Sequence, residues 1–218
     1  RMDLRQKIGQ CFTLGFRDCF LRPDVAKGIQ EFHCAGLRLV PWEREGVRYA
    51  KDEDRRFKGG AIAEDNPRRM GSAIYAMPRQ YAELLNRWQQ MALDRPHGVV
   101  LHFAIDQEGD AYNDYIRGGV NLLPSQMGLA ATGDPANACR AAKAVGRQLR
   151  ALGAHMIHSP VLEVNVNPAN PEMNFRAFGD EAQTVAEYAS QALRGYREAG
   201  ITAVAKHFPG RGASGGDA

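Results

Sequence analysis

Apolar residues along the chain follow two spacings that alternate. Within residues 78–92 and 181–198 they recur three and four positions apart, which places them on one face of a helix. Between such segments lie short apolar runs, such as residues 99–105, which are typical of strands buried on both faces. We predict helices over residues 3–10, 24–33, 78–92, 135–152 and 181–198, and strands over residues 11–16, 36–40, 99–105, 155–162 and 201–205.

Strands that alternate regularly with helices predict a parallel α/β fold. Polar residues directly follow three of the strands, at Asp106, at Asn165 and Asn167, and at Lys206 with His207. Barrels of βα units place their active sites at such strand ends, which favours a (β/α)8 TIM-type barrel over an open doubly wound sheet. The absence of a Gly-rich phosphate-binding turn after the first strand weakens a nucleotide-binding fold further.

The predicted elements amount to five strand–helix units, whereas a complete barrel needs eight. We therefore expect residues 1–218 to form a single barrel domain that is incomplete at its C-terminal end. The edge strands, 11–16 and 201–206, should lack neighbours and leave an apolar face uncovered. The remaining units should come from further residues, from a partner chain or from a swapped copy.

Composition changes sharply at one place, because 15 of the 27 residues from 43 to 69 are charged and show no apolar period. We interpret this stretch as an insertion rather than a domain, since it lacks the residues to build a core. Because it follows the strand at 36–40, it should emerge on the face that carries the active site. There it either covers the site or forms a solvated surface loop.

The overall composition excludes several classes of protein. The chain is 44% hydrophobic and 24% charged with a formal net charge of +3, which argues against disorder and against nucleic acid as the main partner. No apolar run is long enough to span a membrane. The start Arg1-Met2-Asp3 shows no signal peptide, which favours the cytoplasm. The cysteines form no CxxC pair and are interpreted as free thiols rather than metal ligands: Cys11, Cys19, Cys34 and Cys139.

Three polar segments are candidates for chemistry, and each also has a structural interpretation. Asp106 and Glu108 either accept hydrogen bonds from ligand hydroxyls or cap a strand-to-turn junction. Lys206 beside His207 needs a carboxylate or several oxygen acceptors if it is buried, and it either faces sugar hydroxyls or pairs with Asp106 to hold the barrel mouth. Arg176 either contacts a sugar or fixes its own loop.

Taken together and in order, these segments resemble the N-terminal barrel domain of family 3 glycoside hydrolases. The resemblance rests on Asp106-Gln-Glu-Gly109, Arg176-Ala-Phe-Gly179 and Lys206-His-Phe-Pro-Gly210, with support from residues 123–127 and 160–168. The ordered set is specific, although each motif alone is weak. It covers most of the chain apart from residues 43–69.

The form Lys-His-Phe-Pro-Gly, followed by Gly212 and Asp217, is most similar to the β-N-acetylhexosaminidase branch. The resemblance implies that Asp106, Arg176, Lys206 and His207 bind the sugar that precedes the scissile bond. It also implies that Asp217 is the dyad partner of a proton-donating histidine immediately after residue 218. The nucleophile, an aspartate on the seventh strand, follows later, and neither a metal nor a cofactor is expected.

The sequence departs from the family pattern in two places. Asp110, Ala111 and Asp114 stand where the family has glycine and a substrate-gripping arginine, and Arg211 stands where this branch has histidine. The main hypothesis is a retaining exo-acting β-N-acetylglucosaminidase whose substrate is a β-linked glycoside or a cell-wall fragment. A β-glucosidase of the same family, a non-catalytic sugar-binding protein and a truncated inactive chain remain alternatives.

Overall fold

The computed structural model describes residues 1–17, 21–40, 78–109, 121 and 123–215. The charged stretch 43–69 and Asp217 therefore lie outside the described residues. The helices are α1 (Leu4–Gly9), α2 (Pro23–Gln30), α4 (Pro78–Leu93), α5 (Gln126–Ala130), α6 (Ala136–Leu152), the 3-10 helix η2 (Asn174–Arg176) and α7 (Ala182–Glu198). The strands are β1 (Thr13–Arg17), β2 (Gly36–Val40), β3 (His102–Ile105), β4 (Met156–Ile157) and β5 (Thr202–Ala203).

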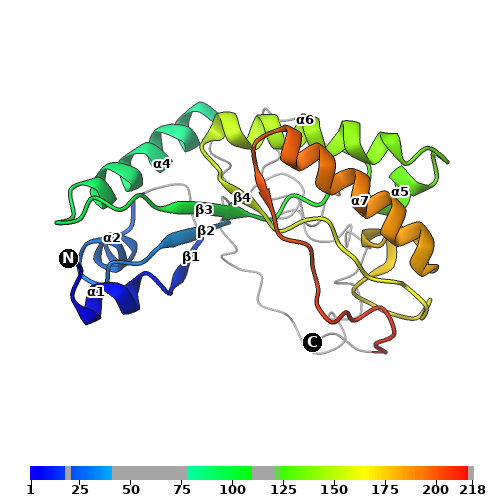
Figure 1. The fold of residues 1–218 in the computed structure, drawn as a ribbon, viewed down its shortest axis with the longest axis horizontal. Helices are drawn as coiled ribbons and strands as arrows, with labels where there is room; N and C mark the ends of the chain where they lie inside the picture. Colours follow the sequence, from blue (N-terminus) through cyan, green and yellow to red (C-terminus); the bar gives the residue numbers. More distant parts are fainter. Residues whose placement is uncertain (18–20, 41–77, 110–120, 122, 216–218) are drawn as a thin grey trace, which may run out of the picture.

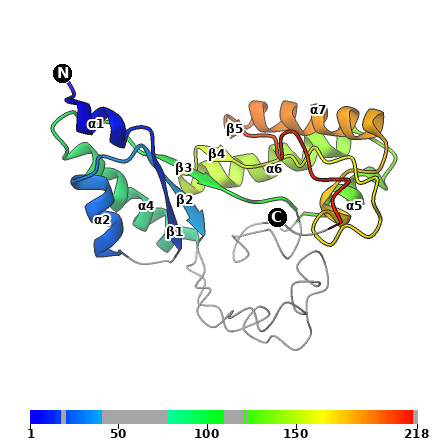
Figure 2. The ribbon, with the colours of Figure 1, turned by 90° about the horizontal axis from the view of Figure 1, so that it is seen from below.

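The five strands form one parallel sheet in the order β1-β2-β3-β4-β5, so neighbours in the chain are also neighbours in the sheet. This order confirms the predicted α/β fold of consecutive βα units. Figure 2 shows α1, α2 and α4 toward one end of the sheet and α5, α6 and α7 toward the other. Within the described residues β1 and β5 are the edges, and the sheet does not close into a barrel.

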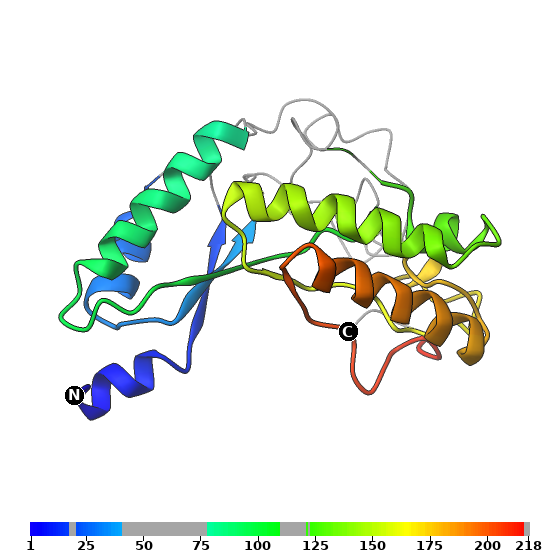
Figure 3. The same ribbon diagram turned by 45° about the horizontal axis from the view of Figure 1, so that its top comes forward.

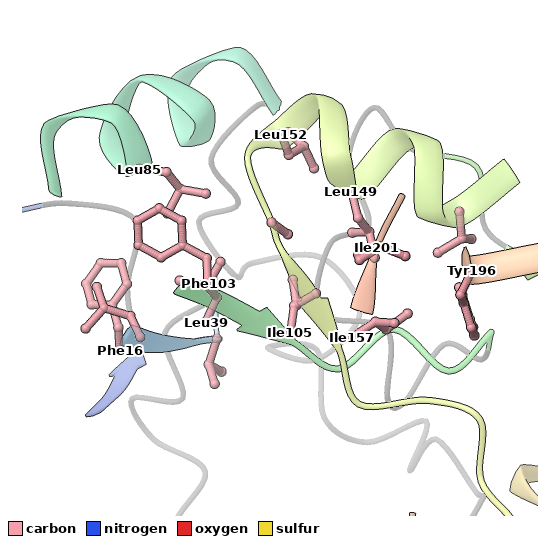
Figure 4. Packing of buried hydrophobic residues seen from close by; sticks show 14 of the residues in the cluster. Phe16, Leu39, Leu85, Phe103, Ile105, Leu149, Leu152, Ile157, Tyr196 and Ile201 are labelled. Atoms are coloured by element: carbon pink, nitrogen blue, oxygen red, sulfur yellow. The ribbon is translucent and has the colours of Figure 1, made fainter. Parts of the chain in front are cut away.

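One face of the sheet is apolar and covered by helices. The register aligns Phe16, Leu39, Ile105, Ile157 and Ala203 in a row across all five strands. The first four side chains are at most 1% exposed. Figure 4 shows Phe16, Ile105 and Ile157 of this row among the core residues below α4 and α6, and Figure 1 shows α4, α6 and α7 on this side of the strands. Burial of this row contributes to the apolar core that fixes the helices on the sheet.

The neighbouring row faces the opposite side and is mostly small or polar: Gly15, Arg38, Ala104, Met156 and Thr202. Successive side chains of a strand point to opposite faces, so the two rows divide the sheet cleanly. Within the described strands this side of the sheet therefore carries no continuous apolar surface. At the edge of β5, as expected for an incomplete sheet, an open groove remains that is lined in part by Leu193 and Ala203. Met156 is the one large apolar side chain in this row, and it is half-buried.

The predicted strand over 155–162 is much shorter in the structure, where β4 contains only Met156 and Ile157. Pro160 has no N–H group and cannot continue a regular ladder. Parallel pairing nevertheless resumes further along, because the Lys206 N–H donates to the Pro160 carbonyl at 3.0 Å and the Leu162 N–H donates to the Lys206 carbonyl at 2.6 Å. These bonds place Lys206 beside residues 160–162.

Two further sequence features can be compared with the structure. Gly153 ends α6 with φ of 99°, the left-handed conformation that a glycine C-cap adopts. Cys11 is exposed and Cys34 and Cys139 are buried, all three as free thiols, while Cys19 lies outside the described residues. Among the described helices, none combines the length and the apolar character that crossing a membrane requires.

The contact between α6 and α7, which lie side by side in Figure 3, depends on a glycine. A Cβ atom added at Gly195 would lie 2.3 Å from the Cys139 carbonyl oxygen. We expect Gly195→Ala to lower the free energy of unfolding by about 1–3 kcal/mol, because the helices must separate and this cost exceeds the gain in helix propensity. Thermal unfolding measures the effect, and Gly15→Ala is the control because its Cβ would meet no atom within 4 Å. Equal stability of the two variants would contradict close helix packing.

Candidate functional site

Asp106 lies directly after β3 and is surrounded by cations. The Lys206 Nζ atom, delivered by the segment after β5, lies 2.7 Å from Asp106 Oδ1. Arg38, from the middle of β2, donates to Asp106 Oδ2 through its Nε atom at 3.1 Å and also through Nη2. His158 Nδ1 lies 3.6 Å from Oδ1. Each oxygen of this buried carboxylate thus has a cationic or imidazole partner.

Lys206 also connects Asp106 to a second buried carboxylate. Its Nζ atom lies 2.5 Å from Glu108 Oε1. Arg176 binds Glu108 with both arms of its guanidinium, Nε to Oε2 at 2.8 Å and Nη2 to Oε1 at 3.1 Å. We call Asp106, Glu108, Arg176 and Lys206 the charged network. Such two-pronged pairing fixes the orientation of the arginine as well as its position.

The charged network keeps its two acids ionised. Burial raises the pKa of Asp106, but the contact with His158 and the charges of Lys206 and Arg38 outweigh it and hold this pKa well below its usual range. Burial also raises the pKa of Glu108, and the nearby Lys206 and Arg176 lower it by more. Both groups are therefore carboxylates at neutral pH, and a carboxylate can only accept hydrogen bonds.

Arg176 is held in place from its main chain by Gln126, which is 3% exposed. The Gln126 Nε2 atom donates to the Arg176 carbonyl at 2.7 Å and to the Val161 carbonyl at 2.9 Å. Its Oε1 atom accepts from the Val161 N–H at 2.9 Å. The side chain of Gln126 thus joins η2 to the segment after β4, and Arg176 also donates to the Glu172 carbonyl at 3.2 Å.

His207 follows Lys206 in the chain, but its side chain binds a different acid. The His207 Nδ1 atom lies 2.7 Å from Glu163 Oε1. Burial lowers the pKa of His207, and although the bond to Glu163 raises it, the charges of Arg211 and Lys206 keep the pKa below the usual range. The imidazole is therefore neutral at pH 7. His207 and Glu163 form a pair beside the charged network rather than a part of it.

Three of the residues predicted for the site come together as expected. Asp106, Arg176 and Lys206 join in one network although 100 positions separate the first from the last. His207 adjoins them through the main chain. Asn167, by contrast, donates its Nδ2 atom to the Ser214 carbonyl at 3.0 Å and so holds a loop. Asp217 and the departures at Asp110, Ala111 and Asp114 lie outside the described residues.

Sequence reasoning missed Arg38, His158 and the importance of Glu163. A signal existed for two of them, because Arg38 interrupts the apolar strand 36–40 and Glu163 interrupts the apolar run 160–164. A charged residue inside such a run needs a buried partner or an exposed position. Within the described ranges no group of three His, Cys, Asp or Glu side chains is arranged to hold a metal ion.

The fold and the site define a protein of consecutive βα units with a buried, fully paired charged network where the parallel strands end. The profile of the Glycosyl hydrolase family 3 N terminal domain matches residues 68–218. A Beta-hexosaminidase, LpqI of Mycobacterium tuberculosis, is 35% identical over 215 residues, which is 98% of this chain and 45% of that protein. The chain belongs to glycosyl hydrolase family 3.

Two further comparisons agree with this assignment. A Cellulomonas fimi protein named Beta-N-acetylglucosaminidase/beta-glucosidase is 43% identical over 88 residues, 40% of this chain and 16% of that protein. The structure of a family 3 beta-N-acetylglucosaminidase from Paenibacillus superposes with a TM-score of 0.79 and 34% identity, covering 100% of this chain and 35% of that one. The chain thus spans less than half the length of each of these three relatives.

Proposed function

We propose that the protein containing these residues is a retaining, exo-acting β-N-acetylglucosaminidase, and that the charged network with His207 binds the sugar before the scissile bond. The observation that carries this proposal is the Lys206 ammonium placed between two buried carboxylates, Asp106 and Glu108. Such an arrangement offers fixed acceptors and a fixed donor to a ring of hydroxyl groups. Membership of family 3 and the names of the relatives support the assignment.

Within this proposal the residues have distinct roles. Asp106 accepts hydrogen bonds from sugar hydroxyls, and Lys206 donates to them. Arg176 holds Glu108 and donates toward the sugar, and His207 contacts a further hydroxyl. The sugar hydroxyls compete with the existing ion pairs for the same side-chain atoms. Binding therefore replaces contacts within the charged network by hydrogen bonds to the sugar.

The chemical steps require residues that follow this segment. In a retaining glycosidase a carboxylate attacks the anomeric carbon while an acid protonates the leaving oxygen, and water then releases the sugar from the enzyme. By resemblance to the family, we place the nucleophile after residue 218 and assign Asp217 as the partner of a histidine proton donor. Imidazole suits this role because it titrates near neutral pH. We further propose that residues 1–218 are one part of a single barrel domain.

Comparing two aryl glycosides tests the proposed substrate. We expect the full-length protein to hydrolyse an aryl β-N-acetylglucosaminide with a kcat/KM at least about tenfold above that for the aryl β-glucoside, since one well-made hydrogen bond to the acetamido group supplies such a factor. The Cellulomonas relative, whose name includes both activities, favours β-glucosidase as the second candidate. The reverse preference would establish that candidate. Binding of N-acetylglucosamine without hydrolysis of either glycoside would indicate a non-catalytic sugar-binding protein.

A further inference from the structure

Glu163 is a buried acid for which the sequence suggested no role. Its side chain is 1% exposed and lies in the segment that follows β4. Three main-chain N–H groups and one ring nitrogen of the segment after Lys206 surround its two oxygens. Oε1 lies 3.0 Å from the His207 main-chain nitrogen and 2.7 Å from His207 Nδ1, and Oε2 accepts from the Arg211 main chain and, at 3.1 Å, from the Gly212 main chain.

The donors around Glu163 determine its protonation. Burial raises its pKa, but the N–H groups of Arg211 and His207 stabilise the charged form and lower the pKa below its usual value. Glu163 is therefore a carboxylate and has no proton to donate. It follows that His207 Nδ1 carries the hydrogen in this pair, because a carboxylate only accepts.

The state of Nδ1 fixes the chemistry of the other ring nitrogen. In neutral imidazole one nitrogen is a donor and the other an acceptor, so a protonated Nδ1 leaves Nε2 with a lone pair. Within the part of the chain that the structure describes, Nε2 has no hydrogen-bond partner. The side chain of His207 is 26% exposed, so a ligand can reach the ring.

Glu163 also holds the main chain of the segment 207–212 against the segment after β4. A Cβ atom at Gly212 would lie 2.0 Å from the Val164 carbonyl oxygen, so the two segments are in direct contact. Asn170 strengthens this contact by donating its Nδ2 atom to the Arg211 carbonyl at 2.8 Å. The anchored segment leads toward Asp217.

We propose that Glu163 is a positioning residue that selects the tautomer of His207 with an accepting Nε2 and anchors the segment 207–212. In this role the ring accepts a hydrogen bond from a sugar hydroxyl instead of donating one. The part of the proposal that concerns the sugar rests on the function proposed above, whereas the tautomer itself does not.

The test compares Glu163→Gln with Glu163→Asp and with the exposed control Glu187→Gln on α7. The glutamine amide can keep its oxygen on the Arg211 and Gly212 N–H groups only by turning its NH2 group toward His207. The NH2 group then donates to Nδ1, which favours the Nε2–H tautomer of the ring, and the His207 main-chain N–H loses its acceptor. Glu163→Asp keeps the charge and should retain the original tautomer.

The tautomer is read from the 15N shifts of the imidazole nitrogens, and a His207→Gln spectrum assigns the signals. We expect Nδ1–H in the full-length protein, in Glu163→Asp and in the control, and Nε2–H in Glu163→Gln. We also expect kcat/KM for the aryl β-N-acetylglucosaminide to fall about tenfold in Glu163→Gln, with partial rescue in Glu163→Asp, because one hydroxyl bond is lost.

The outcomes separate the proposed role of Glu163 from the proposed function of the protein. An Nε2–H ring in the unsubstituted protein, or an unchanged tautomer in Glu163→Gln with reduced activity, would overturn the assignment of Glu163 as the residue that selects the tautomer. A tautomer switch in a protein that neither binds N-acetylglucosamine nor hydrolyses the aryl glycosides would support that assignment and would refute the proposed function instead. If Glu163→Gln fails to fold, the spectra of the unsubstituted protein and of Glu163→Asp still decide the tautomer.

Discussion

Replacing Lys206 with methionine is expected to destabilise the protein by about 3–5 kcal/mol at pH 7, the usual cost of removing one partner from a buried ion pair. Methionine preserves most of the side-chain volume but leaves Asp106 and Glu108 without their shared cation. Both acids are buried, and Lys206 itself is 16% exposed. Urea unfolding of the full-length protein, followed by tryptophan fluorescence, measures the change.

The effect of Lys206→Met should depend on pH in a defined direction. The folded protein lowers the pKa of both acids, so their ionised forms stabilise it above the ordinary carboxylate pKa, and this stabilisation is lost as the pH falls through the lowered pKa. Without Lys206 the pKa of each acid rises, and protonation then removes the uncompensated charge. The difference in the free energy of unfolding between the unsubstituted protein and Lys206→Met should therefore become smaller below about pH 4.

Lys143→Met is the matched control for this experiment. Lys143 Nζ lies 2.7 Å from Glu198 Oε2, the distance at which Lys206 meets Asp106, but both partners of this pair are more than a third exposed. A surface pair of this kind contributes about 0–1 kcal/mol. If Lys206→Met is no more destabilising than Lys143→Met, the network is not held together by buried charge.

Replacing Asp106 with asparagine is expected to reduce kcat/KM by at least about 100-fold, because hydrogen bonds to a charged acceptor contribute about 1.5–3 kcal/mol each. The loss of stability should be smaller than for Lys206→Met. Lys206 keeps Glu108 as a partner, and the half-exposed Arg38 can be solvated. Initial rates and urea unfolding on the same preparation separate the two effects.

Comparing the loss of kcat/KM with the loss of stability in Asp106→Asn distinguishes a sugar-binding role of Asp106 from a purely structural one. A structural ion pair alone predicts that Asp106→Asn loses stability while its folded fraction keeps normal activity. Asp134→Asn is the control, because Asp134 also binds an arginine but lies on the surface, at 2.8 Å from Arg140. We expect Asp134→Asn to leave kcat/KM unchanged.

The sequence predicts the elements well where local pattern determines them. The strand 36–40 and the long helices match to within a residue or two, because their apolar spacing reflects a single covered face. The apolar run 155–162 predicts one continuous strand, yet the ladder is interrupted before Pro160. Beyond this point, pairing depends on Lys206, which lies 46 residues away in the chain. Local pattern carries no information on such a partner.

For the candidate site, too, local sequence pattern does not indicate which distant residues pair. Asp106 and Lys206 are recognisable because polar residues directly follow apolar strands, and parallel strands end at one edge of a sheet. Arg38 binds an acid 68 positions away, and nothing in its own neighbourhood indicates which one. Glu163 binds mostly main-chain N–H groups, which every sequence contains, so its partners leave no pattern to detect.

A crystal structure of the full-length protein with N-acetylglucosamine bound tests the central claim most directly. We predict that sugar hydroxyls lie within hydrogen-bonding distance of Asp106, Lys206 and His207, with Arg176 still paired to Glu108. A sugar ordered elsewhere on the protein, with the contacts of Lys206 to Asp106 and Glu108 unchanged, would contradict it.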